Sequence, residues 1–154
     1  GGVIKNQSIG VASANGKAYI HSAGYQDKVE GVWGHTQNQD GFLESMAAAA
    51  QAVADYFGDN ILYISVMNNM SVDCDCVSKP ESVKLKDYGI LASLDPVALD
   101  QACVDIIFNM TPSEGNDNAP LVERIKSRHG THTIEHAEKI GLGSRKYQLI
   151  SIDK

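Results

Sequence analysis

The stretch Ile61-Leu62-Tyr63-Ile64-Ser65-Val66-Met67 decides the expected fold. It is apolar on both of the faces that a β-strand presents, which favours a strand covered on both sides, as in the parallel sheets of α/β proteins. The chain leaves the carboxyl end of this strand and soon reaches Asp73-Cys74-Asp75-Cys76. In open α/β sheets, ligands bind beyond that end of the strands. The sequence therefore predicts a ligand site directly after the strand.

The pair Cys74 and Cys76 contains two of the three cysteines of the chain, and carboxylates flank it. Neighbouring negative charge raises the pKa of a thiol and disfavours the reactive thiolate. A bound cation would reverse this argument, because a metal deprotonates its thiol ligands and attracts nearby carboxylates. The motif is therefore better interpreted as half of a metal site than as a lone nucleophile. Alternatively, the two cysteines are small, half-buried residues at a turn, since zinc sites more often use Cys-x-x-Cys.

Other segments extend the predicted sheet and its covering helices. Residues 88–93 form a second apolar run, and Asp95-Pro96 after it is typical of a helix start, with Asp as N-cap and Pro at the first position. Asp40 is a candidate N-cap for a helix over residues 40–57, where apolar residues recur at helical spacing and Gly58 provides a stop. The alanines at 47–50 are small enough to let this helix lie close against a sheet.

The two ends of the chain complete the expected topology. Residues 8–13 and 17–21 are short strand-like runs joined by Asn15-Gly16, a tight-turn dipeptide, which favours a hairpin. A helix is the alternative for the first few residues. Further helices are expected over residues 120–128 and 131–140, and a closing strand over 147–152. The predicted fold class is α/β, with a mixed, largely parallel sheet covered by helices on both faces. Residues 1–154 are expected to be one domain.

His21 and His35 are the candidate ligands that would complete a metal site with Cys74 and Cys76. His21 ends a strand-like run, and His35 lies in a long loop of the kind that is often functional. Thiolate and imidazole ligands together suit zinc or iron. Cys103 is expected to be a core residue, because free cysteine is among the most buried types.

Two other functions stay open at this point. One is a small-molecule enzyme that uses the same loop, with Asp95 or Asp100 as the acid–base group. The other is a structural or interaction domain whose cysteines are inert.

The segment His132-Thr-Ile-Glu135-His136 matches the H-x-x-E-H pattern of one class of zinc peptidases. This spacing places both imidazoles on one face of a helix. Ile134, Ala137 and Ile140 would fill the other side, so the pair is equally consistent with the polar face of an amphipathic helix. Whether these histidines join the metal site is left open.

Composition excludes several classes of function. The chain is 43% hydrophobic and 21% charged, and its net charge of −6 argues against a nucleic-acid partner. No apolar run reaches the roughly 18 residues of a membrane span. Three cysteines are too few for a disulfide framework, which favours a reducing compartment and predicts the cytoplasm. Because the chain begins Gly1-Gly2-Val3 without an initiator Met, we expect a C-terminal fragment whose partner is a missing N-terminal segment of the same protein.

Several motifs together resemble one protein family. They are Asp73-Cys-Asp-Cys76, Asp87-Tyr-Gly-Ile-Leu-Ala-Ser93, Asp95-Pro-Val-Ala-Leu-Asp-Gln-Ala102 and Ile140-Gly-Leu-Gly-Ser-Arg-Lys-Tyr147. In this order they resemble the C-terminal part of the domain of unknown function 362 family, whose members are often labelled uncharacterised iron–sulfur-center proteins. Residues 10–21, with their Gly-Lys-x-x-x-His pattern, resemble the middle portion of that family.

Together with the pair Cys74 and Cys76, the resemblance implies a protein that binds a metal or an iron–sulfur cluster, with a redox or metal-handling role and a redox partner. Many members carry a ferredoxin-like insert whose clustered cysteines hold [4Fe–4S] centres. The corresponding place here, between His21 and Trp33, contains no cysteine. Four thiolates normally hold such a cluster, and this chain has three cysteines. The expected cofactor is therefore a metal ion, either zinc or iron, with an iron–sulfur cluster as the alternative that the resemblance implies.

Overall fold

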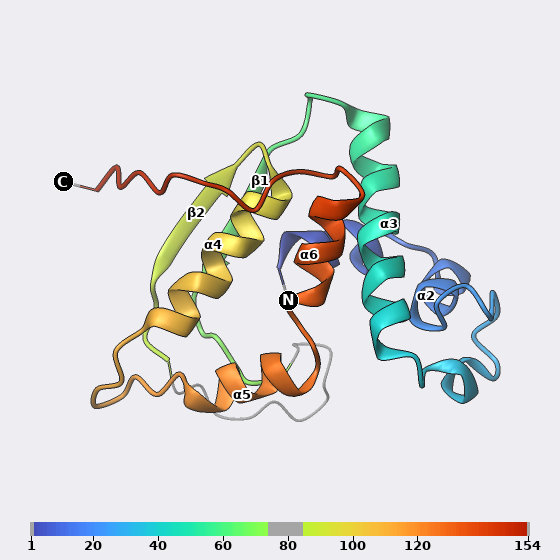
Figure 1. Cartoon of the computed structure of the whole chain (residues 1–154), viewed down its shortest axis with the longest axis horizontal. Helices are drawn as coiled ribbons and strands as arrows, with labels where there is room; N and C mark the ends of the chain where they lie inside the picture. Colours follow the sequence, from blue (N-terminus) through green and yellow to red (C-terminus); the bar gives the residue numbers. More distant parts are fainter. Residues whose placement is uncertain (1, 74–84, 154) are drawn as a thin grey trace.

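The computed structural model describes residues 2–73 and 85–153, apart from the side chains of Trp33 and His35 (Figure 1). The described elements are, in chain order, α1 (Val3–Lys5), the π-helical turn η1 (Asn6–Gly10), α2 (Ala14–His21), the 3-10 turn η2 (Val32–His35), α3 (Gln39–Phe57), β1 (Tyr63–Met67), β2 (Gly89–Ser93), α4 (Pro96–Asn109), α5 (Ala119–Ser127) and α6 (His132–Lys139). The fold therefore mixes helices and strands, as expected. In this part of the chain, no helix combines the length and the apolar character that crossing a membrane requires.

The sheet differs from the largely parallel one that the sequence predicts. In the described residues, β1 and β2 pair antiparallel and form a two-stranded sheet, in which Ser65 lies opposite Leu91 and Val66 opposite Ile90. The long connection of residues 68–88 is thus a hairpin connection. The connection begins at the carboxyl end of β1 and ends at the amino end of β2. Because the two strands are antiparallel, these two ends lie at the same edge of the sheet.

Among the described residues, helices cover one face of this sheet and not both. Tyr63, Met67 and Leu91 point to the covered face, where they share a core cluster with Leu99 and Ala102 of α4. The opposite face is exposed and apolar; it comprises Ile64, Val66, Ile90 and Ala92. Alternate residues therefore face the core and the solvent, which is the pattern of a half-covered antiparallel sheet.

The N-terminal region is helical, and the predicted hairpin over residues 8–21 is wrong. The Ser13 side chain accepts a hydrogen bond from the backbone N–H of Gly16, which caps the start of α2. The dipeptide Asn15-Gly16 consequently lies in the first turn of a helix instead of a strand-to-strand turn. Local capping by Ser overrides the strand-like composition of this short segment.

The starts of α3 and α4 follow the capping rules, but α3 begins before the predicted N-cap, Asp40. The N-cap of α3 is Asn38, whose side chain accepts from Gly41, and Asp40 lies in the first turn. The helix ends at Gly58, which has a φ of +55°. The start of α4 is as predicted: Asp95 accepts hydrogen bonds from the backbone of the first turn, and Pro96 is the first helical residue.

Helix α3 packs closely against neighbouring helices in the part of the molecule that lies on the right in Figure 1. Ala47 and Ala50 are fully buried and contact Ile134 and Ala137 of α6. The alanine run thus allows close approach as predicted, but the neighbour is a helix and not a sheet. Figure 1 shows α2 on the other side of α3 from the two strands.

The C-terminal segment does not form the predicted strand over residues 147–152. It is fastened to α4 instead: Asp95 accepts a hydrogen bond from the backbone of Ser144, and Asp105 accepts one from the hydroxyl of Tyr147. Beyond Tyr147 the side chains are exposed. Leu149 and Ile152 therefore contribute little to the core.

Candidate functional site

The connection between β1 and β2 carries the predicted metal motif, and the structure describes its two stems. Cys74 and Cys76 lie outside the described residues. The described stems are residues 68–73, which lead to the motif, and residues 85–88, which lead from it to β2. The way in which these stems are fixed determines how well the loop is supported.

Asp87 joins the two stems at their base. Its carboxylate accepts a hydrogen bond from the side-chain amide of Asn68 at 2.7 Å and another from the backbone N–H of Asn69 at 2.9 Å. Asn69 has a φ of +49°, a left-handed conformation that asparagine tolerates better than most residues. The backbone N–H of Tyr88 also donates to the carbonyl of Met67. These bonds continue the strand pairing into the loop.

The stems are also attached to the rest of the molecule. Leu85 is buried in the core cluster that contains α4 and both strands, and Met70 packs against the same cluster. The backbone N–H of Lys86 donates to the side chain of Asn116 in the segment that follows α4. Both ends of the loop therefore rest on packed structure.

Arg124 of α5 forms an ion pair with Asp73, the residue that precedes Cys74. The guanidinium lies 3.3 Å from one carboxylate oxygen, and both side chains are partly buried. The carboxylate of Asp73 is therefore already paired with a cation. The sequence suggests purely negative surroundings for the thiols, whereas the structure pairs Asp73, one of the flanking carboxylates, with a positive charge. A nearby cation favours the thiolate form of cysteine.

Of the two predicted histidine ligands, the structure describes the side chain of His21 but not that of His35. His21 lies at the end of α2, where its Nδ1 contacts the carbonyl oxygen of Lys17 at 2.6 Å and its ring stacks on Phe42. Since α2 lies across α3 from the strands (Figure 1), the described structure does not bring His21 to the stems of the loop. His35 belongs to η2, but its side chain lies outside the description.

Cys103, which was predicted to be a core residue, is partly buried at the edge of the core. It packs against the cluster formed by α4 and the strands. Burial raises the pKa of its thiol, while an interaction with Ser65 of β1 opposes that shift. A buried thiol with a raised pKa is a poor nucleophile and a poor metal ligand.

Asp95 and Asp100, the candidate acid–base groups, serve as acceptors for backbone N–H groups. The two oxygens of Asp95 accept from the first turn of α4 and from Ser144. The two oxygens of Asp100 accept from Val3 at 2.8 Å and from Ile4 at 3.0 Å. Burial raises the pKa of Asp100 to about 6, although these N–H groups oppose the shift. Both carboxylates thus join segments that are distant in the sequence.

The histidines of the H-x-x-E-H segment face α3. His132 Nε2 lies 3.1 Å and His136 Nδ1 lies 3.4 Å from the same oxygen of Glu44. His129, just before α6, pairs in the same way with Asp40 at 2.9 Å. Glu135 is exposed and takes no part in this group. These contacts attach α6 to the amino-terminal half of α3.

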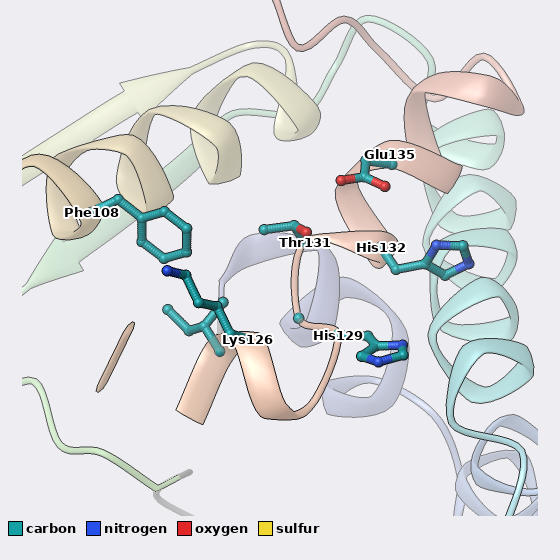
Figure 2. Close-up of a pocket in the computed structure, with 8 residues that line it drawn as sticks. Phe108, Lys126, His129, Thr131, His132 and Glu135 are labelled. Carbon is teal, nitrogen blue, oxygen red and sulfur yellow. The ribbon is translucent and has the colours of Figure 1, made fainter. Parts of the chain in front are cut away.

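A pocket of about 440 Å³ lies beside these histidines (Figure 2). Its lining residues come from α4, α5, α6 and the turn between the last two: Phe108, Ile125, Lys126, His129, Gly130, Thr131, His132 and Glu135. The ammonium of Lys126 lies 5.7 Å from the ring centre of Phe108. Among the residues that the structure describes, no three His, Cys, Asp or Glu side chains are arranged to hold a metal ion. The peptidase interpretation of His132 and His136 therefore has no support from their present geometry.

Sequence reasoning missed the two residues that fix the loop, Asp87 and Arg124. In the sequence, Asp87 is only the first residue of the motif over residues 87–93. Its role can be recognised only when β1 and β2 are known to be antiparallel neighbours. The partner of Asp73 is 51 residues away in the sequence. No local pattern predicts such a contact.

Comparison with known proteins gives one match. A family model described as Domain of unknown function (DUF362) matches residues 1–105 of the 154. The matched region includes the motif of Cys74 and Cys76, both strands and the first ten residues of α4. No curated protein and no solved structure matches the chain.

Proposed function

Because the chain belongs to the DUF362 family, we propose that it is a metal-binding protein with a redox or metal-handling role, and that Cys74 and Cys76 are its central ligands. The observation that carries the proposal is the ion pair between Arg124 and Asp73. It holds the backbone one residue before Cys74 and places a cation there.

Support for a metal site comes first from the way in which the loop is held. Ligands bind a metal well when their backbone is positioned before the metal arrives, because less conformational freedom is lost on binding. Asp87 ties the stems together, and Leu85 anchors one stem in the core. A loop that merely connected two strands of a hairpin would need only a few residues.

The charges around the motif also suit thiolate ligands. A metal site of two thiolates needs both cysteines deprotonated, and the guanidinium of Arg124 favours that state. Asp75 lies between the two cysteines in the sequence and adds a carboxylate near a bound cation. Zinc and iron are the metals that thiolate and imidazole ligands suit best.

A [4Fe–4S] cluster held by this chain alone does not fit its cysteines. The sequence contains three, and Cys103 is packed in the core. Four thiolates normally hold such a cluster. The chain therefore supplies Cys74 and Cys76 either to a single metal ion or to a centre completed by ligands from another polypeptide, such as a redox partner or a further segment of the same protein.

His21 and His35 are proposed as additional ligands with less support. The contact between His21 Nδ1 and a backbone carbonyl is typical of metal-binding histidines, since it fixes the tautomer and leaves Nε2 available. However, the position of α2 beyond α3 does not favour a site shared with Cys74. The two cysteines therefore carry the proposal.

The enzyme alternative is less well supported. Asp95 and Asp100 each use both carboxylate oxygens to accept backbone hydrogen bonds. Neither residue lines the pocket beside His129 and His132. Their geometry explains a role in folding without invoking catalysis.

The test is the metal content of protein purified without oxygen, measured by elemental analysis. We expect a stoichiometric amount of zinc or iron in the wild type, and its loss in the double variant Cys74→Ser, Cys76→Ser. The matched control is Cys103→Ala, which should retain the metal because Cys103 lies in the core. Absence of metal from the wild type, or an equal amount in the double variant, would contradict the proposal and favour a domain with inert cysteines.

A further inference from the structure

The pocket of about 440 Å³ between α4, α5 and α6 has walls of different chemical character (Figure 2). Phe108 and Ile125 form an apolar wall, and Lys126, Thr131 and Glu135 bring polar groups to the same space. The volume falls within the range of small-molecule pockets, about 300 to 1,000 Å³. Apolar walls with a few polar groups are typical of sites that bind small organic molecules.

The two histidines that line this pocket are already paired with carboxylates of α3. His129 contacts Asp40 at 2.9 Å, and His132 contacts Glu44 at 3.1 Å. Figure 2 shows both rings turned toward α3 and away from Phe108. Their polar atoms are therefore engaged with α3, and other groups of the lining must recognise a ligand.

Lys126 and Glu135 give the pocket one accessible charge of each sign. Within the described part of the chain, neither side chain forms an ion pair, with the other or with a third residue. The ammonium of Lys126 lies 5.7 Å from the ring centre of Phe108, a cation–π contact that favours one position of this flexible side chain. Both charged side chains are exposed, so a ligand can reach them.

A ligand that satisfies both charges must itself carry an anion and a cation. Its anionic group pairs with Lys126 and accepts from the hydroxyl of Thr131, which makes no capping hydrogen bond to α6. Its cationic group pairs with Glu135. Figure 2 shows Thr131 between Lys126 and Glu135, so the two ends of a small zwitterion face the two charges.

We propose that this pocket binds a free α-amino acid with an apolar side chain. Such a molecule carries a carboxylate, an ammonium group and an apolar part that contacts Phe108 and Ile125. A simple carboxylate leaves Glu135 without a partner, and a simple amine leaves Lys126 without one. The pocket uses none of the residues of the proposed metal site and does not depend on it.

The test is an NMR titration of the full chain with L-leucine and with three molecules that each lack one of its features. The compound 4-methylpentanoate lacks the ammonium group, 3-methylbutylamine lacks the carboxylate, and glycine lacks the side chain. We expect saturable shifts of the backbone amides of Gly130 and Thr131 with leucine. Its affinity should exceed that of each comparison molecule by at least about threefold, the effect of one exposed ion pair or of a partial apolar contact.

Two variants assign the charged contacts. Lys126→Gln should abolish the preference for leucine over 3-methylbutylamine, and Glu135→Gln should abolish the preference for leucine over 4-methylpentanoate. Both side chains are exposed, so both variants should fold. The matched controls are Lys139→Gln on α6 and Glu123→Gln on α5, which remove the same charges outside the pocket and should leave leucine binding unchanged.

Three results would overturn the proposal. The first is absence of saturable binding, and the second is equal affinity for leucine and for the two molecules that lack one charge. The third is an equal effect of the pocket variants and their controls, which would show that leucine responds only to net charge. The Cys74→Ser, Cys76→Ser variant should bind leucine normally, which separates this site from the metal site.

Discussion

The guanidinium of Arg124 lies 3.3 Å from the carboxylate of Asp73, and this contact joins α5 to the residue before Cys74. It is the one described ion pair between the stems of the cysteine loop and a helix. It also changes the electrostatics of the motif, since one of the two flanking aspartates is already neutralised. Arg124 is therefore the first residue to test for an effect on the cysteines.

Replacing Arg124 by glutamine should make the loop thiols less reactive. Loss of the cation leaves Asp73 unpaired, and both changes disfavour the thiolate. We expect alkylation by iodoacetamide at pH 7 to slow by about two- to fivefold, the effect of a partly exposed ion pair. The measurement uses metal-free protein with Cys103→Ala, so that Cys74 and Cys76 alone react. Lys126→Gln, which removes a cation from the same helix, should leave the rate unchanged; an equal effect of both variants would contradict a local role for Arg124.

Replacing Asp87 by alanine should loosen the base of the loop. The variant loses the hydrogen bonds from Asn68 and Asn69, so the free energy of unfolding should fall by about 1 kcal/mol in urea denaturation. If the loop binds a metal, the affinity should also fall by about tenfold, a typical effect of losing a residue that supports the ligands. Asp59→Ala, on the exposed connection that precedes β1, is the control and should change neither quantity. Unchanged stability in Asp87→Ala would show that these bonds do not hold the stems.

Asp100 should make the protein less stable as the pH rises from about 4 to about 6. Its pKa is about 6 in the folded protein and 3.8 in the reference state, so the folded protein keeps the proton to a higher pH. In this window the unfolded chain binds fewer protons, and the free energy of unfolding therefore falls with rising pH. The full difference between the two pKa values corresponds to about 3 kcal/mol.

Urea denaturation between pH 4 and pH 7 measures this dependence. Asp100→Asn cannot ionise, so the Asp100 contribution to the slope should vanish. At pH 4 the variant should also be less stable than the wild type, because an asparagine amide offers one acceptor oxygen to the N–H groups of Val3 and Ile4, where aspartate offers two. Asp59→Asn serves as the exposed control. A slope in Asp100→Asn equal to that of the wild type would show that the carboxyl titrates normally.

The parts of the fold that depend on local interactions could be predicted, and the pairing of the strands could not. The start of α4 follows from the Asp95 side chain and the fixed φ of Pro96, both of which act within one turn. The run at 61–67 looks buried on both faces, yet Ile64 and Val66 are exposed. Periodicity does not distinguish a doubly covered strand from a strand with an apolar outer face.

One signal for the antiparallel pairing was present in the sequence. Parallel neighbours need a crossover, which is usually a helix, and residues 68–88 show no helical pattern. The site was less predictable than the strands. The attachment of Asp73 to Arg124, and of Glu44 to His132, depends on tertiary packing, which sequence spacing does not encode.

Glu44 should stabilise the contact between α3 and α6. It accepts contacts from both His132 and His136, so Glu44→Ala leaves two partly buried imidazoles without their partner. We expect the free energy of unfolding to fall by about 1 kcal/mol, because the carboxylate is itself partly exposed. Glu135→Ala removes an exposed carboxylate between the two histidines and should have no effect. Equal effects of the two variants in thermal unfolding would show that Glu44 acts only through net charge.

Gly143 should tolerate no side chain, because of its position against Asp95. A Cβ at this position would overlap Asp95 Oδ1, the oxygen that accepts the hydrogen bonds from the first turn of α4. Gly143→Ala must therefore displace the N-cap, and we expect it to lower the free energy of unfolding by about 2 to 3 kcal/mol. Gly34→Ala, where nothing lies within 4 Å of the added carbon, is the control and should change stability by less than about 0.5 kcal/mol.

A double variant identifies the cause of the Gly143 effect. Serine is smaller than aspartate and still caps a helix, so Gly143→Ala should cost less in an Asp95→Ser background than in the wild type. Two residues in contact are expected to give such a non-additive result, with a coupling of about 1 kcal/mol or more. Urea denaturation of the wild type, both single variants and the double variant measures this coupling. Additive effects would show that Gly143→Ala destabilises the protein by distorting its own loop and not by displacing Asp95.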